Sequence, residues 1–319
     1  SGNNYDVTYA TVDLGAITPR PITVTAVADE KVYDGTIASD GVPTITSGTL
    51  GTGDNDTDSW SQTFDTRHVG TEKTLTPKGA VNDGNDGNNY DVTFVPVDLG
   101  TITPKELTVT GVTASNKVYD GTTEATVDPS SASLVGVIDG DSVTLVTGSA
   151  TGTFDNRNTG GGKTVQIGGL TLAGSDAHNY YVTQPTTTAD ISPRPISVTA
   201  VEDTKEYDGT TNSDGEPEIS SGSLATGDTE TDWTQTFDTK HAGSGKTLTP
   251  TGTVTDGNSG NNYSYTFVFV STGSITQRPI AVTAGADEKV YDGTTDSDGT
   301  PTVTSGALAP GDTSAWTQT

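Results

Sequence analysis

Cysteine and methionine are absent from the 319-residue sequence, so no disulfide can stabilise the fold and no cysteine ligand is available for zinc. Basic residues are scarce: 15 Lys and Arg stand against 42 Asp and Glu, for a formal net charge of −27. This imbalance disfavours a nucleic-acid partner, because a phosphate backbone needs basic side chains to neutralise it. No run of about 18 apolar residues is present, so we expect no membrane insertion by this segment.

Helical patterning is missing too: no window of 11 or more residues has apolar side chains at helical spacing, and the chain holds 39 Gly and 15 Pro. Short runs alternate apolar and polar residues instead, as at Ile22 to Ala26, Trp60 to Phe64 and Tyr90 to Phe94. This alternation is typical of half-buried strands, and we count about seven per repeating unit. The pattern predicts an all-β fold of Ig-like β-sandwiches, with an open barrel as the alternative.

What the sequence does contain is a long repeat. The stretch Lys31 to Thr36 (KVYDGT) returns almost unchanged three times, and its tyrosines, at 33, 119, 207 and 291, lie 86, 88 and 84 residues apart. Each period has the length of a small domain. We therefore predict whole repeats at 20–104, 105–193 (a variant type) and 194–277, with 1–19 as the C-terminal fragment of a preceding repeat and 278–319 as the N-terminal fragment of a fourth.

The predicted repeats are joined by short segments that contain proline. Proline fixes φ and holds the residue before it extended, so each link is expected to be short and stiff. The sequence thus predicts sandwiches joined end to end, with neighbouring repeats of the chain as their partners. The segments are Ile17 to Ile22, Ile102 to Lys105, Ile191 to Ile196 and Ile275 to Ile280.

The second repeat carries KVYDGTT followed by TFDNRNTGGGKTVQIGGLTLAGSDAHNYYVTQPTTTADISPRPISVTA. This combination resembles the YDG repeat family of bacterial secreted and surface proteins, which includes filamentous-haemagglutinin-like adhesins. The other repeats keep Tyr-Asp-Gly, Phe-Asp-Thr-Arg/Lys and Gly-Asn-Asn-Tyr in the same order. The resemblance implies a mostly β stalk or repeat module, without catalytic residues to carry over.

The Tyr-Asp-Gly stretch itself is predicted to be a turn with a tyrosine anchor. Asp54, Asp56 and Asp58 stand at alternate positions, as the oxygen ligands of Ca²⁺ loops often do. Because the equivalent loop, with Asp228, Glu230 and Asp232, is one residue shorter, we favour a solvated loop and keep Ca²⁺ as the alternative; no other cofactor is expected. His68, His178 and His241 fall in three different repeats, so we expect no shared histidine site.

A second hypothesis concerns an intramolecular isopeptide bond, which some sandwich domains of surface adhesins form between a buried Lys and an Asn beside a carboxylate. The favoured alternative is that the Lys pairs with a nearby Asp at the surface while the Asn caps a turn. The recurring residues, repeat by repeat, are Lys31, Asp65 and Asn89; Lys117, Asp155 and Asn179; and Lys205, Asp238 and Asn262.

These observations favour a structural stalk or filament segment of a large secreted or cell-surface, adhesin-like protein that supplies length and mechanical continuity. An acidic array without Cys or Met suits an extracellular or cell-surface location. No nucleophile-elbow motif or phosphate-binding loop occurs, so we expect no enzymatic activity. The alternatives are a filament of identical chains joined by strand addition, and a carbohydrate- or partner-binding module using exposed Trp60, Trp233 and Trp316.

Overall fold

The structure, a computed structural model, describes residues 4–231 and 233–319. In these residues strands alternate with turns, and the helical element present is a single 3-10 turn, η1 (Ala177–Asn179). The prediction of an all-β chain is confirmed. Within the same residues, no helix has the length and apolarity needed to cross a bilayer.

The first repeat has seven strands in two sheets. One sheet has the order β3-β1-β6 and the other β2-β7-β5-β4. Ile22 and Val24 of the first sheet share a buried cluster with Trp60 of the second, so the two sheets enclose one core, as in an Ig-like sandwich. The strands are β1 (Arg20–Thr25), β2 (Asp29–Val32), β3 (Thr44–Ser47), β4 (Trp60–Phe64), β5 (Gly70–Gly79), β6 (Tyr90–Val95) and β7 (Val97–Thr103).

The third repeat has the same two sheets, β22-β20-β27 and β21-β28-β25-β24, with a small extra ladder of β23 and β26. In both repeats the first strand pairs in parallel with the strand that begins at the Gly-Asn-Asn-Tyr tyrosine. The strands are β20 (Arg194–Thr199), β21 (Thr204–Glu206), β22 (Glu218–Ser221), β23 (Thr229–Glu230), β24 (Thr234–Phe237), β25 (Gly243–Thr251), β26 (Val254–Thr255), β27 (Tyr263–Val268) and β28 (Val270–Thr276).

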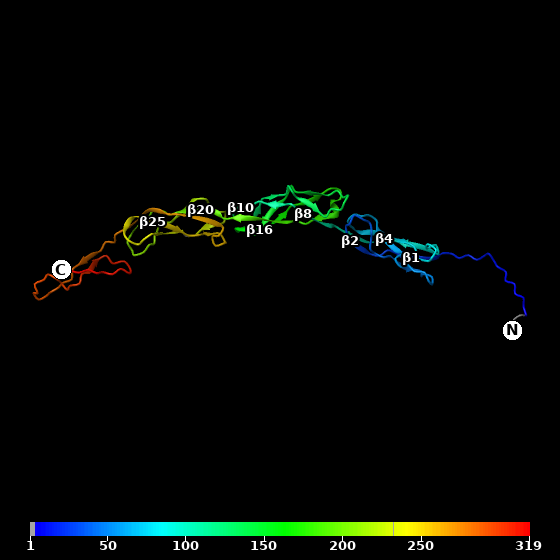
Figure 1. Cartoon of the computed structure of the whole chain (residues 1–319), viewed down its shortest axis with the longest axis horizontal. Helices are drawn as coiled ribbons and strands as arrows, with labels where there is room; N and C mark the ends of the chain where they lie inside the picture. Colours follow the sequence, from blue (N-terminus) through cyan, green and yellow to red (C-terminus); the bar gives the residue numbers. More distant parts are fainter. Residues whose placement is uncertain (1–3, 232) are drawn as a thin grey trace. The chain divides into compact units, whose positions relative to one another are not determined.

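The second repeat is cut into more and shorter strands. Its larger sheets have the orders β13-β8-β18 and β10-β19-β16-β15-β11. Strands β8, β10 and β16 of this repeat are labelled in Figure 1. The strands are β8 (Lys105–Thr110), β9 (Thr113–Ala114), β10 (Lys117–Val118), β11 (Glu124–Ala125), β12 (Val127–Asp128), β13 (Ser133–Val135), β14 (Thr144–Val146), β15 (Thr151–Phe154), β16 (Gly160–Gly168), β17 (Thr171–Ala173), β18 (Tyr180–Val182) and β19 (Thr186–Ser192).

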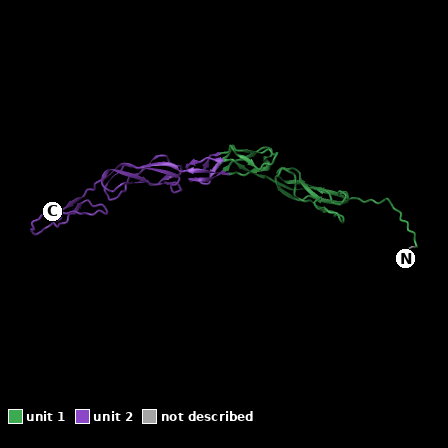
Figure 2. Cartoon of the chain, in the orientation of Figure 1, with its two compact units in different colours: residues 1–112, 128–151, 167–185 green, residues 113–127, 152–166, 186–319 purple. Residues whose placement is uncertain are grey.

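Two compact units divide the chain, and the boundary runs through the second repeat (Figure 2). One unit comprises Ser1–Val112, Asp128–Thr151 and Ile167–Pro185, and the other Thr113–Val127, Gly152–Gln166 and Thr186–Thr319. The first unit therefore contains the junction between repeats one and two, and the second unit the junction between repeats two and three. Residues 278–319 add β29 (Ala281–Thr283), paired with β30 (Thr302–Ser305).

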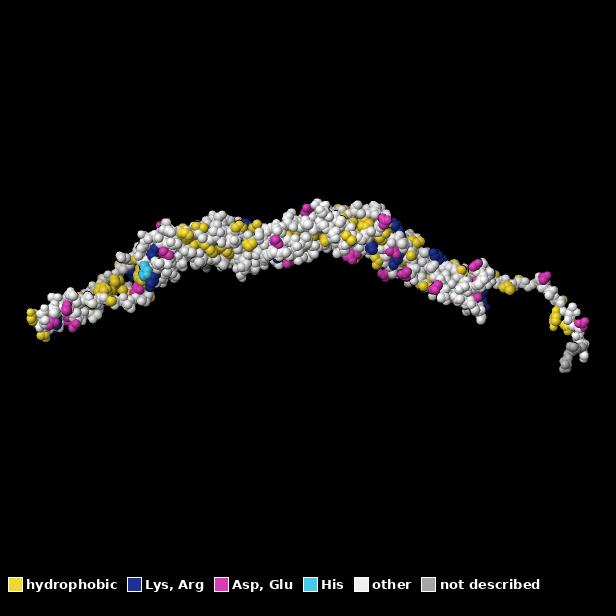
Figure 3. All heavy atoms as spheres, viewed as in Figure 1, with side chains coloured by type: hydrophobic (Ala, Val, Ile, Leu, Met, Phe, Trp, Pro, Cys, Tyr) yellow, Lys and Arg dark blue, Asp and Glu magenta, His cyan; other side chains and the backbone are white. Residues whose placement is uncertain are grey.

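The repeats follow one another directly, as the proline-containing segments predicted. Pro104 is the single residue between β7 and β8, and Pro193 the single residue between β19 and β20. The core of the first unit also continues through the junction, because Tyr33 and Phe64 of repeat one share a buried cluster with Leu107 and Tyr180 of repeat two. On the face seen in Figure 3, acidic side chains occur at several places along the chain.

Candidate functional site at the junctions between repeats

The Tyr-Asp-Gly stretch is a turn that its own lysine and aspartate hold together. Lys31 Nζ donates to Asp34 Oδ1 at 2.8 Å, and the same oxygen accepts from the Thr36 backbone N–H at 2.9 Å. Partial burial alone would raise the pKa of Asp34, but the hydrogen bonds from Lys31 and Thr36 hold this pKa below its usual value. Gly35 has φ +80°, in the left-handed region that glycine adopts without strain. The prediction of a turn is confirmed.

The tyrosine of this turn points into the next repeat. Tyr33 is 1% exposed, and its hydroxyl donates at 2.8 Å to Asp141 Oδ2, 108 residues further on. Tyr180 donates to the same oxygen at 2.5 Å, and the two tyrosine rings meet edge to face at 5.3 Å. The Ile138 backbone N–H donates to the Tyr180 hydroxyl, which fixes the direction of its proton. One carboxylate thus binds a tyrosine from each repeat.

Arg67 supplies the positive charge that this carboxylate needs. Its guanidinium lies 3.1 Å from Asp141 Oδ1 and 3.3 Å from Asp176 Oδ1. The Asp141 side chain has no exposed surface, and burying an unpaired carboxylate is costly. Together Tyr33, Arg67, Asp141 and Tyr180 form a cluster that we call the interlock of the first junction.

A buried asparagine makes a further contact across the same junction. Asn179 Oδ1 accepts from the Val69 backbone N–H at 3.0 Å, so its amide nitrogen must donate to His68 Nδ1, 3.2 Å away. The rings of His68 and His178 lie 5.1 Å apart. These two histidines of different repeats are therefore neighbours. Asn179 binds Nδ1 of His68 across the junction.

The second junction has the same interlock with different residue numbers. Tyr119 and Tyr263 donate to Asp228 Oδ2 at 3.0 and 2.8 Å, and Arg157 lies 3.3 Å from Asp228 Oδ1. The two tyrosine rings again meet edge to face, at 5.6 Å. Asn262 Oδ1 accepts from the Thr159 backbone N–H at 2.9 Å, as Asn179 does from Val69. The arrangement is thus a recurring feature of the fold.

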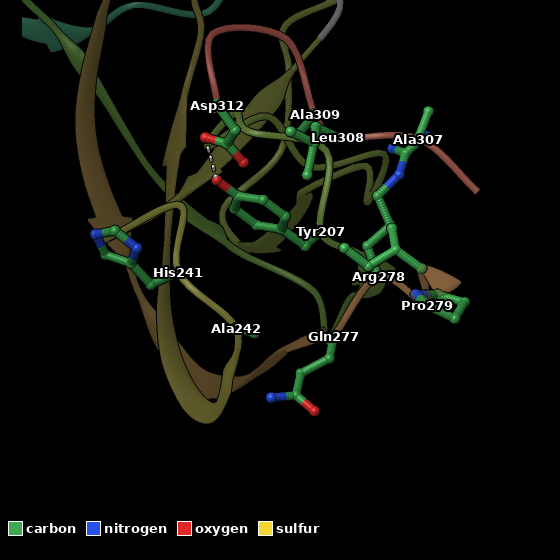
Figure 4. A pocket seen from close by; sticks show the side chains of 11 residues that line it. Tyr207, His241, Ala242, Gln277, Arg278, Pro279, Ala307, Leu308, Ala309 and Asp312 are labelled. Atoms are coloured by element: carbon green, nitrogen blue, oxygen red, sulfur yellow. Dashed lines mark hydrogen bonds between the residues drawn. The ribbon is translucent and has the colours of Figure 1, made fainter. Parts of the chain in front are cut away.

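At the third junction the Tyr-Asp-Gly tyrosine binds a carboxylate as well, since Tyr207 donates to Asp312 at 3.1 Å. Lys240 stands where the other junctions have arginine. A cavity of about 630 Å³ lies beside Tyr207, and Figure 4 shows the side chains that line it. The cavity is lined by Tyr207, His241, Ala242, Gln277, Arg278, Pro279, Ile280, Ala307, Leu308, Ala309 and Asp312.

The structure gives the Ca²⁺-loop candidates of the first repeat separate roles. Asp54 accepts from the Tyr90 hydroxyl at 2.6 Å, Asp56 accepts from Trp60 Nε1 at 3.2 Å, and Asp58 adopts φ +54° in the loop.

In the third repeat, Asp228 belongs to the interlock, Glu230 lies exposed on β23, and Asp232 lies outside the described residues. No group of three or more His, Asp or Glu side chains is placed to hold a metal ion in the described part of the chain.

The isopeptide candidates are not brought together either. Lys31, Lys117 and Lys205 each pair with the aspartate of their own turn, at 2.8 to 2.9 Å. Asp65 and Asp155 pair instead with Lys73 and Lys163.

The remaining members of the isopeptide set also have other partners. Asp238 accepts from the Thr239 backbone N–H, and Asn89 accepts from the Asn85 side chain. Asn179 and Asn262 bind backbone across the junctions. Each lysine is thus held by a turn, as the favoured alternative predicted.

The tryptophan platform is wrong for two of its three residues. Trp60 and Trp233 are 6% and 7% exposed, and their rings pack edge to face against Phe94 and Phe267. Trp316 is partly exposed and lies in the segment 278–319. Core packing therefore explains Trp60 and Trp233.

Sequence reasoning missed the interlock because its members lie about one repeat apart. A signal was present in the sequence, because a tyrosine, then an arginine or lysine, and then an aspartate recur in the same order at each junction. The aspartate also lies three residues after the backbone N–H that binds the second tyrosine in each complete socket.

A comparison with family models agrees with the repeat organisation. Among solved structures, the chain is similar to the crystal structure of the I9–I11 tandem from titin, at 10% sequence identity and a TM-score of 0.24, covering 82% of this chain and 98% of that one. No curated protein matches the sequence. The family model named YDG domain matches residues 18–97, 103–189 and 192–268, one match in each predicted whole repeat. These matches cover well over half of the sequence, and the chain belongs to the YDG domain family.

Proposed function

We propose that the chain is a structural segment of a secreted or cell-surface, adhesin-like protein, in which YDG repeats supply length and mechanical continuity. The role requires no catalysis and no nucleic-acid partner. An acidic composition without Cys or Met supports the extracellular location, as does the resemblance of the repeats to those of bacterial surface proteins.

One observation carries the proposal: each complete junction buries a carboxylate of the later repeat under a tyrosine and an arginine of the earlier one. Asp141 and Asp228 both have fully buried side chains. Tilting one repeat against the next would expose these groups or separate them. Removing one partner of a buried ion pair costs about 3–5 kcal/mol in other proteins, so bending at such a junction should be resisted.

The interlock does not act alone, because each junction is tied at separate points. The proline bridge joins the last strand of one repeat to the first strand of the next, and the buried asparagine binds the loop after the arginine. Contacts at several separate points restrict the motion of one repeat against the next more than a single contact would. Such a junction suits a protein whose task is to hold a distance.

Small-angle X-ray scattering of the whole chain tests this proposal. Arg67→Ala should leave Asp141 buried without its cation and broaden the distribution of interatomic distances, because the first junction bends more freely. Lys78→Ala, which removes an exposed basic side chain of the same repeat, is the matched control and should scatter like the parent.

The fluorescence of buried Trp60, measured here and below in a Trp233→Phe, Trp316→Phe background, reports whether repeat one stays folded in each variant. If Arg67→Ala and Asp141→Asn keep the parent's scattering profile while Trp60 remains buried, the junction does not depend on the interlock and the proposal fails.

A further inference from the structure

The first repeat carries the accepting half of an interlock at its own N-terminal end. Tyr90 donates to Asp54 Oδ2 at 2.6 Å, as Tyr180 donates to Asp141 and Tyr263 to Asp228. We call Gly51, Asp54, Asn89 and Tyr90 the free socket. It contains the same groups that receive Tyr33 at the first junction and Tyr119 at the second.

The free socket is already arranged for its occupant. In each of the three complete sockets, the residue three positions before the aspartate donates its backbone N–H to the tyrosine hydroxyl: Gly51 at 2.6 Å, Ile138 at 3.1 Å and Ala225 at 2.8 Å. This bond leaves the tyrosine proton directed at the carboxylate. Since it forms in the first repeat without an occupant, binding needs no rearrangement of these groups.

The asparagine of the free socket differs from its counterparts in its surroundings. Asn179 and Asn262 are fully buried and accept a backbone N–H from the preceding repeat. Asn89 is exposed, and its Oδ1 accepts from Asn85 within its own loop. Asn258 makes the same local bond to Asn262, so this bond is compatible with occupancy.

We propose that the free socket is a docking surface for the tyrosine–arginine end of a YDG repeat placed directly before it in tandem. The proposal rests on the proposed function above. The incoming tyrosine hydroxyl would donate to Asp54, the guanidinium would pair with the second Asp54 oxygen, and the backbone N–H two residues after the arginine would donate to Asn89 Oδ1.

The chemistry of the socket selects this occupant. A carboxylate beside an aromatic ring edge requires a hydrogen-bond donor, a cation and a second ring, and the Tyr-Asp-Gly turn with its arginine supplies all three. The turn glycine fits closely: a Cβ at Gly35 would lie 3.1 Å from Ile138, and one at Gly121 would lie 3.2 Å from Ala225. Gly51 offers still more room at this position, because it has no side chain.

The type of repeat does not matter for the match. The variant repeat receives Tyr33 at the first junction and donates Tyr119 at the second, so the same groups join both repeat types in both orders. A copy of 105–193 is therefore a suitable occupant for the free socket. Its Pro193 would precede Arg20-Pro21 as it precedes Arg194-Pro195 in the chain.

The test compares the chain with an extended version in which a second copy of 105–193 replaces residues 1–19. Hydrogen exchange at the Gly51 amide is the readout, with the Ile138 amide of the first junction as internal reference. We expect at least about tenfold slower exchange at Gly51 in the extended chain, which corresponds to about 1.4 kcal/mol. Asp54→Asn, or Tyr119→Phe with Arg157→Ala in the added copy only, should abolish the slowing.

Unchanged exchange at Gly51, with the added copy folded by its own amide protection, would overturn the inference. The same experiment separates this failure from that of the proposed function. If Arg67→Ala speeds exchange at Ile138 while Gly51 never responds to the added repeat, only the free socket is refuted. If exchange at Ile138 does not respond to Arg67→Ala either, the interlock does not stabilise the first junction and the proposed function fails as well.

Discussion

At each complete junction, one buried carboxylate accepts hydrogen bonds from two tyrosines and pairs with one arginine. Asp141 has no exposed side-chain surface, so each group that binds it also offsets its desolvation. Removing any one donor leaves the buried charge under-satisfied and destabilises the fold. Replacing the whole cluster with apolar residues would instead be neutral or stabilising, because no buried charge remains. The individual residues are therefore expected to be sensitive to conservative substitutions.

Tyr33→Phe tests one donor without changing the ring. Loss of a hydrogen bond to a buried charged acceptor should lower the free energy of unfolding of the first unit by about 1.5–3 kcal/mol. Urea denaturation followed by Trp60 fluorescence measures the change. Tyr181→Phe, which removes the hydroxyl of a half-exposed tyrosine, should change the free energy by less than about 0.5 kcal/mol. Equal effects of the two variants would contradict the assigned role of Tyr33.

Alkaline pH tests the same cluster by titration. Burial, followed by the hydrogen bond to the junction aspartate, raises the pKa of Tyr119 and of Tyr180 to about 12 from the ordinary value of 10.0. A raised pKa means that the folded state holds its proton more tightly, so this stability is complete below pH 10 and is lost as pH rises to about 12. Urea midpoints should fall steeply across this range. A urea midpoint that stays constant from pH 10 to pH 12 would refute this.

At the scale of the element, the Tyr-Asp-Gly turn recurs because each of its three residues has a separate role. The tyrosine enters the next repeat, the aspartate closes the turn, and the glycine takes a positive φ and lets the neighbouring repeat approach. The last point applies to Gly35, where an added Cβ would lie 3.1 Å from the side chain of Ile138.

Gly35→Ala should cost more than its backbone strain alone. An alanine at φ +80° costs about 1–2 kcal/mol, and the contact with Ile138 adds to it. Gly53→Ala is the matched control, because Gly53 has φ +96° with no atom within 4 Å of an added Cβ. Thermal unfolding of the two variants should show a lower midpoint for Gly35→Ala. If the midpoints coincide, the glycine serves the turn alone.

The strands were predictable because alternation along one strand is local information. Ile22 and Val24, or Trp60 and Phe64, lie on one face by their spacing alone, and all four are buried. The interlock could not be predicted in this way, because Tyr33 and Asp141 are separated by more than a whole repeat and no local pattern relates them. Asp54 and Asp228 looked like members of carboxylate-rich loops, since their tyrosine partners lie 36 and 35 residues further along the chain.

At the scale of the whole molecule, stability should pass between neighbouring repeats within a unit. The core cluster of the first unit contains Leu75 and Phe64 of one repeat and Leu107 of the next. Repeats that share a core and a buried ion pair gain stability from each other, as in other linear arrays.

Leu75→Ala measures this transfer. The substitution removes a fully buried side chain and should cost about 2–5 kcal/mol in repeat one. Hydrogen exchange should also quicken at the Tyr180 side of the first junction, and stay unchanged at the interlock of the second. Leu248→Ala, the same change in repeat three, should give the reverse pattern. Exchange confined to the mutated repeat in both variants would show that the repeats unfold independently.

Because every complete repeat carries a donating half and an accepting half of the interlock at its two ends, the gene can gain or lose whole copies without a compensating mutation. Insertion of one period between Pro104 and Lys105 would bring its own tyrosine, arginine and aspartate in phase. A recombination event out of phase would instead leave a junction aspartate without the tyrosine and arginine of the preceding repeat. We therefore expect related chains to differ by whole repeats rather than by parts of one.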